Sequence, residues 1–129
     1  MTRTVALFGS IVLAGAIVAV DVTVFAHHSA AQLFDQEKTI EIQGTVKVWR
    51  LSNPHPFLLL EVTAENNQKI DWSISFGNAA GTALRRRGWS AETLKVGELV
   101  RVKGHPAKAA GSYGIDGAVL TRADGKPVP

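Results

Sequence analysis

Apolar and polar side chains alternate through the middle of the chain, which predicts three consecutive β-strands. The strands are expected at residues 39–50, 57–63 and 69–76. On the first strand the apolar face carries Ile40, Ile42, Val46 and Val48. On the third strand the same alternation is expected to bury Ile70, Trp72, Ile74 and Phe76. Turn-forming residues at 65–68 separate the second strand from the third, so the three strands should form a meander.

The period of the pattern changes after the third strand. Small and apolar residues recur at helical spacing and predict a short helix over residues 78–87. Asn78 is expected to cap the start of this helix, and Gly88 is expected to follow its last turn. Two further strands are predicted at 98–104 and 112–121, and a polar tail at 123–129 is expected to fray.

This order of elements is typical of one small fold. Gly44 interrupts the apolar face of the long first strand, and a glycine there often marks a bulge or a sharp coil. Such a strand can serve both halves of a barrel. We therefore predict an all-β domain with one short helix over residues 40–122: a five-stranded OB-like Greek-key barrel with the helix between strands three and four. A mixed α+β sandwich is the alternative, and neither topology assigns a function.

The first 26 residues have the composition of a secretory signal peptide. Arg3 supplies a positive charge, and residues 5–20 form an uncharged apolar run. Val24 and Ala26 then place small residues at −3 and −1 of a cleavage site. The alternative is an uncleaved anchor, which needs about 20 apolar residues. Asp21 argues against an anchor, because a carboxylate inside a bilayer is costly.

Cleavage after Ala26 would make His27 the mature N-terminus. Residues 27–39 would then form an N-terminal arm, with a possible helical turn, pinned by Leu33 and Phe34. Loss of the signal peptide leaves the net charge at +3, which is too mild for a nucleic-acid-binding protein. No membrane contact is expected once the signal peptide is removed.

The 129-residue chain contains no cysteine. Disulfides, thiolate metal sites and thiol catalysis are therefore excluded. An exported domain without disulfides fits the bacterial periplasm better than a small eukaryotic secreted scaffold. Enzyme activity is not expected, because the sequence has no Gly-x-Ser-x-Gly nucleophile motif and its carboxylates lack the paired spacing of acid and base catalysts.

Several short motifs occur together along the presumed mature chain. They are residues 26–29 (Ala-His-His-Ser), Phe34-Asp35, residues 44–46 (Gly-Thr-Val), Trp49 with residues 53–55 (Asn-Pro-His), residues 86–89 (Arg-Arg-Gly-Trp) and residues 94–104. In this combination the chain resembles a family of small exported bacterial proteins of unknown function. The resemblance implies export and a small β-rich domain, but it implies no reaction.

The four histidines are the candidate metal ligands of this chain. At a free N-terminus His27 offers an α-amine and an imidazole to the same ion, an arrangement that suits Cu(II), which accepts tetragonal nitrogen ligands. His55 lies between two prolines, which stiffen its loop, and it is the expected second ligand. His28 is the alternative ligand, and His105 is the least favoured. Cu(II) is the only cofactor expected.

The predicted topology relates these histidines in space. Loops 51–56 and 105–112 should lie at the same end of the barrel, so His55 and His105 are expected to be neighbours. The first strand should begin at the opposite end, and the arm, about 40 Å long if extended, would have to reach back. Alternatively the histidines bind no metal and the barrel is an interaction module for a periplasmic partner protein or a small ligand.

Two other groups of side chains suggest weaker hypotheses. Arg85, Arg86 and Arg87 point around the helix rather than converging, so we expect them to be solvated and to oppose the helix dipole rather than to grip an anion. The three tryptophans could form a stacking platform for bases, although packing in the core or at the rim is the expected role.

Overall fold

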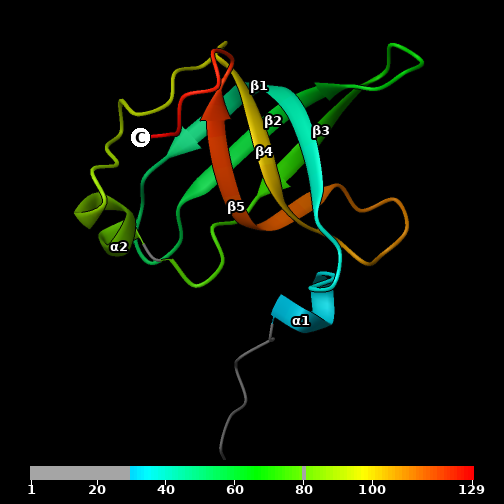
Figure 1. The fold of residues 1–129 in the computed structure, drawn as a ribbon, viewed down its shortest axis with the longest axis horizontal. Helices are drawn as coiled ribbons and strands as arrows, with labels where there is room; N and C mark the ends of the chain where they lie inside the picture. The colour runs from blue at the N-terminus through cyan, green and yellow to red at the C-terminus, as the bar shows by residue number, and fades with distance from the viewer. Residues whose placement is uncertain (1–29, 80) are drawn as a thin grey trace, which may run out of the picture.

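The computed structural model describes residues 30–79 and 81–129, which form a closed β-barrel with two short helices (Figure 1). The predicted signal peptide and the two histidines that follow it, His27 and His28, lie outside the described residues. The strands are β1 (Ile40–Arg50), β2 (Phe57–Thr63), β3 (Lys69–Ile74), β4 (Leu99–Pro106) and β5 (Gly114–Arg122). The helices are α1 (Ala30–Leu33) and α2 (Gly81–Arg86).

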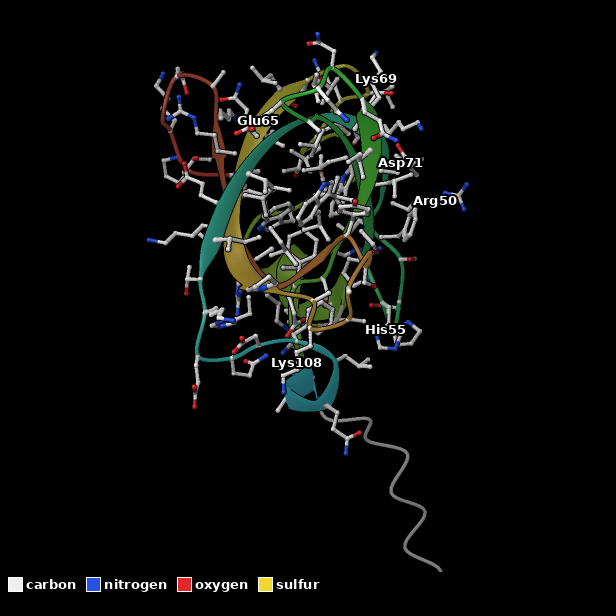
Figure 2. The ribbon with its side chains drawn as sticks, turned by 90° about the vertical axis from the view of Figure 1, so that its right-hand side faces the viewer. Arg50, His55, Glu65, Lys69, Asp71 and Lys108 are labelled. Atoms are coloured by element: carbon white, nitrogen blue, oxygen red, sulfur yellow. The ribbon has the colours of Figure 1, made fainter. Side chains whose placement is uncertain are left out.

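The strand order around the barrel is β1-β2-β3-β5-β4, and β4 closes on β1. Every neighbouring pair is antiparallel except β3 and β5, which are parallel. The prediction of an all-β OB-like barrel with its helix between the third and fourth strands is therefore confirmed. Figure 2 places Glu65 and Lys69 at one end of the barrel and His55 and Lys108 at the other.

Strand β1 belongs to both halves of the barrel. Its first half pairs with β4 and its second half with β2, and Thr45 is paired with both neighbours. Gly44 stands at this change of partner, where a Cβ would lie only 3.0 Å from the carbonyl oxygen of Glu61. The expectation that this strand serves both halves of the barrel is therefore confirmed, and Gly44 permits a close approach to β2.

The β-bulge in β1 lies beyond Gly44, between Val46 and Val48. The extra residue reverses the side of the strand that faces the core from this point onward. Trp49, rather than Val48, consequently packs against the core, opposite the fully buried Leu58. The prediction that Val48 lies on the apolar face was wrong for this reason.

Helix α2 ends as predicted but begins later. Gly88 has a φ of +92°, and the N–H groups of Gly88 and Trp89 donate to the carbonyls of Arg85 and Leu84. This pair of bonds is a Schellman motif, in which glycine readily supplies the left-handed residue. Leu84 and Trp89 are buried, so the helix and its cap contribute directly to the core.

Three aromatic rings from distant segments pack together beside this helix. Trp49, Phe76 and Trp89 have ring centroids 5.2–5.9 Å apart. Trp49 also donates from Nε1 to the carbonyl of Ser90 at 3.0 Å. Two of the three tryptophans therefore have the packing role that was expected. Phe76 joins the cluster although β3 ends two residues earlier, at Ile74.

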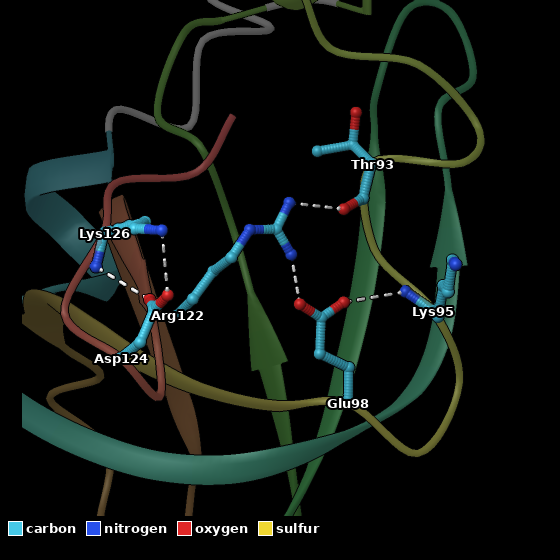
Figure 3. Close-up of polar contacts among 6 residues, drawn as sticks. All are labelled: Thr93, Lys95, Glu98, Arg122, Asp124 and Lys126. Carbon is cyan, nitrogen blue, oxygen red and sulfur yellow. Dashed lines mark hydrogen bonds and ion pairs between the residues drawn. The ribbon is translucent and has the colours of Figure 1, made fainter.

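The C-terminal segment does not fray, contrary to the prediction. Val128 is 8% exposed and donates its N–H to the carbonyl of Leu120, and Pro127 forms a bridge with Thr121. Nearby, Arg122 binds Glu98 and also donates to the carbonyl of Thr93 at 3.1 Å (Figure 3). The polar composition of residues 123–129 did not predict this packing, because Val128 alone supplies the buried apolar contact.

Within the described part of the chain, neither helix has the length and hydrophobicity that crossing a bilayer requires.

Candidate functional site

His55 lies in the loop that joins β1 to β2. Its side chain is exposed, and its carbonyl oxygen accepts a hydrogen bond from Ser52 Oγ at 2.7 Å. The peptide bond between Asn53 and Pro54 is cis. Because Ser52 closes the loop across three residues, the imidazole is carried on a compact turn and faces solvent.

The same loop is fixed to helix α2 by two side chains. Arg85 donates from Nη2 to the carbonyl of Leu51 at 2.6 Å. Asn53 Oδ1 accepts the backbone N–H of Thr82 at 2.9 Å and the Thr82 hydroxyl at 3.3 Å. Arg85 is exposed, as expected, but its guanidinium also binds a carbonyl of the histidine loop, which was not predicted.

Gly81 explains how closely the helix and loop approach. A Cβ at this position would lie 2.7 Å from Asn53 Oδ1 and even closer to the carbonyl oxygen of Ser52. The helix begins here, so Asn78 is not its N-cap as predicted. Asn53 takes that role from a different segment, since it accepts the free N–H of the first turn.

The N-terminal arm docks on the loop between β4 and β5. Phe34 forms a bridge with Ala107, and the N–H of Lys108 donates to the carbonyl of Leu33 at 2.9 Å. Lys108 Nζ also donates to the carbonyl of Ala31 at 2.7 Å. Leu33 is 58% exposed, so Phe34 and backbone hydrogen bonds, rather than both apolar side chains, hold the arm.

The arm starts at the same end of the barrel as His55. Ile40 pairs with Gly104 near the end of β4, so β1 begins beside the β4–β5 loop. The prediction that it begins at the opposite end was wrong, because β1 runs antiparallel to β4 and its first residue pairs near the last residues of that strand. Helix α1 and His55 lie at the same end of the barrel in Figure 2, but Figure 1 shows the β1–β2 loop beside α2, on the side away from α1.

An ion pair within the arm gives a pH-dependent signal. Lys38 Nζ lies 3.1 Å from Asp35 Oδ2, and this hydrogen bond lowers the pKa of Asp35 below its usual 3.8. A carboxyl group with a lowered folded-state pKa stabilises the fold above its unfolded pKa, and that contribution is lost as pH falls through the folded-state value. Lys38 is exposed and Asp35 is only half-buried, so the effect on stability is small.

Lys38→Ala is therefore expected to raise the pKa of Asp35 toward its ordinary value, measured by NMR titration of the side-chain carboxyl carbon. Lys69→Ala is the matched control, because Lys69 pairs with Glu61 on a different part of the barrel. An Asp35 titration that is the same in wild type and Lys38→Ala would contradict the observed pairing.

His105 lies on β4 and contacts the arm. Its Nδ1 is 2.7 Å from the carbonyl oxygen of Lys38. A ring nitrogen facing a carbonyl carries the proton, so this bond fixes the tautomer of the neutral imidazole. The His105 ring is hydrogen-bonded to the arm, whereas the His55 carbonyl is hydrogen-bonded within its own loop. No hydrogen bond joins the two histidines among the described residues. The expected pairing of these histidines has no support in their contacts.

Among residues 30–79 and 81–129, no group of three or more His, Asp or Glu side chains is arranged to hold a metal ion. His27 and His28 lie outside this range, so the predicted site of His27, His28 and His55 cannot be assembled from the described residues.

Asp116 is the only buried charged side chain among residues 30–79 and 81–129, and it accepts a hydrogen bond from Ser75 Oγ at 2.6 Å. This bond joins β5 to the end of β3.

An aromatic pair borders the β4–β5 loop. Trp72 and Tyr113 have ring centroids 5.4 Å apart, and Tyr113 is 45% exposed. The sequence pattern predicted a packing role for Trp72 but none for Tyr113, which lies just before β5. The pair offers a partly exposed stacking surface on the described part of the barrel.

The chain was compared with known proteins. Residues 14–116 match a family described as a family of unknown function (DUF6152). No curated protein matches the sequence. Since the matched range covers most of the 129 residues, the chain belongs to this uncharacterised family.

Proposed function

We propose that the protein is an exported periplasmic binding module that holds one Cu(II) ion between His27 and His55. His28 is the alternative ligand from the arm. The observation that supports this proposal is the docking of the arm at the His55 end of the barrel (Figure 2). Ala30, the first described residue, is three positions from His27, so about 10 Å of extended chain joins the docked arm to the first ligand.

The donors suit the ion. After cleavage behind Ala26, His27 would supply an α-amine and an imidazole that chelate together, and His55 would supply a third nitrogen. Cu(II) binds nitrogen ligands in tetragonal geometry and exceeds the other divalent first-row ions in affinity. The described residues contain no nucleophile motif, and we propose binding rather than catalysis.

Titration of Cu(II) into the processed protein tests this function. His27→Ala and His55→Ala are each expected to weaken binding more than about a hundredfold, since losing a ligand costs more than losing the groups that orient one. One extra residue before His27 should have a similar effect, because it removes the α-amine from the chelate. Isothermal calorimetry and the electron paramagnetic resonance spectrum of Cu(II) report affinity and nitrogen ligation.

His105→Asn is the matched control for these variants. The asparagine amide can replace the Nδ1 donor to Lys38, so arm docking is kept while an imidazole is removed. Copper affinity should stay at the wild-type value. If His27→Ala, the extended N-terminus and His55→Ala all bind Cu(II) as wild type does, the copper site is refuted.

The alternative is a metal-free module that docks a partner protein or small ligand. The partly exposed pair of Trp72 and Tyr113 favours it, because aromatic faces with one exposed edge are common anchors in binding surfaces. Binding of a partner protein or small ligand that needs no copper and is lost in Tyr113→Ala would favour this alternative.

A further inference from the structure

We infer that Asn53 and Arg85 are positioning residues that hold the His55 loop in the conformation that presents the imidazole to a metal ion. This inference rests on the proposed function, because it concerns the ligand that His55 would provide. Neither residue touches the proposed ion. Arg85 binds the loop backbone from the helix, and Asn53 binds the helix backbone from the loop.

Three consecutive loop residues each meet helix α2. The carbonyl of Leu51 receives the Arg85 guanidinium, the backbone of Ser52 lies against Gly81, and the Asn53 amide oxygen caps the first turn. Leu51 is buried, so the loop is anchored at its first residue by packing as well as by the hydrogen bond.

This anchoring extends to His55 through restricted backbone. Pro54 and Pro56 each fix one φ angle, and the residue before each proline is confined to extended geometry. Ser52 Oγ then bonds the His55 carbonyl at 2.7 Å. With Leu51 to Asn53 held on the helix, few backbone torsions remain free between the anchor and the imidazole.

A fixed loop matters for an ion held by two separate segments. Ordering a loop upon binding costs conformational entropy that a preformed loop avoids. Groups that orient a metal ligand typically contribute ten- to a hundredfold to affinity. We call the Asn53 and Arg85 contacts the clamp. Loss of the clamp is therefore expected to weaken copper binding about tenfold while leaving every ligand present.

The first experiment needs no metal. Backbone ¹⁵N relaxation of Ser52 and His55, which keep an N–H although Pro54 and Pro56 have none, should give order parameters of about 0.85 in wild type and below about 0.6 in both Asn53→Ala and Arg85→Met. Arg87→Met is the matched control, because Arg87 is exposed and has no hydrogen bond to the loop among the described residues. Asn53→Asp keeps the capping acceptor and should keep the loop ordered. Unchanged order in both clamp variants overturns the inference.

The second experiment is a double-mutant cycle with Cu(II). Arg85→Met should weaken binding about tenfold when His55 is present and should not weaken it in a His55→Ala background. Removing a positive charge would by itself favour a cation, and Arg87→Met measures that opposing effect. An equal loss in both backgrounds would show that Arg85 does not act through His55 and would overturn the inference.

The two proposals can fail separately. If the processed wild-type protein binds no Cu(II), the proposed function fails and the relaxation data alone decide whether the clamp orders the loop. If wild type binds Cu(II) through His27 and His55 but the cycle shows no coupling, the function stands and the clamp does not. Asn53→Ala gives a second route to either result should Arg85→Met fold poorly.

Discussion

Gly104→Ala adds one methyl group and is expected to lower the free energy of unfolding by about 3 kcal/mol or more. A Cβ at position 104 would lie 2.5 Å from Ile115 Cγ2 and 2.6 Å from the carbonyl oxygen of Asp116. The second contact is with backbone, which cannot rotate away, so β4 and β5 must separate. Urea unfolding followed by tryptophan fluorescence measures the loss.

Gly114→Ala is the matched control for this substitution. Its new Cβ would meet its nearest neighbours, Phe34 and Ser73, at 3.5 Å, an ordinary contact distance. Gly44→Ala should fall between the two, because its closest contacts are at 3.0 Å. Equal stability of the Gly104 and Gly114 variants would show that β4 and β5 do not approach as closely as described.

Leu60→Ala is the second large effect and is expected to cost about 2–5 kcal/mol. Leu60 is fully buried on β2, opposite Val46 and Trp72 on the neighbouring strands. Truncation removes apolar contacts on both sides and leaves a cavity that a closed barrel cannot easily collapse. The same urea titration measures it, with an unchanged slope if the native state stays compact.

Leu33→Ala provides the control, since it deletes the same atoms from an exposed position on α1. Its effect should lie within about 0.5 kcal/mol. A loss at Leu33 as large as that at Leu60 would mean that the arm contributes to the core, contrary to its observed exposure.

The fold could be predicted because burial of one face leaves a period of two in the sequence. That period located the three strands of the meander, and the change to helical spacing located α2. It could not locate the bulge in β1, because inserting one residue reverses the two faces without changing which residue types occur. Val48 and Trp49 are both apolar, so nothing in the sequence identified which of them faces inward.

The candidate site was less predictable. The prolines around His55 identified a shaped loop, but its attachment to α2 depends on side chains that bond backbone atoms. A backbone carbonyl such as that of Leu51 is the same for every residue type, so the sequence carries no sign of its partner Arg85. The position of the arm was misjudged for a related reason: the coil of β1 is a property of its pairing with two strands.

The way the last described residues fold back over β5 has a consequence for the behaviour of the protein in concentrated solution. β3 pairs only with Gly114 and Ile115 at the start of β5. Beyond them, the N–H of Arg122 donates to the carbonyl of Lys126 and the N–H of Val128 donates to the carbonyl of Leu120, so the chain itself occupies part of the edge that β3 leaves uncovered. An uncovered border of this kind is a template on which another molecule can add a strand. Self-capping by a few residues therefore discourages stacking of barrels into larger aggregates.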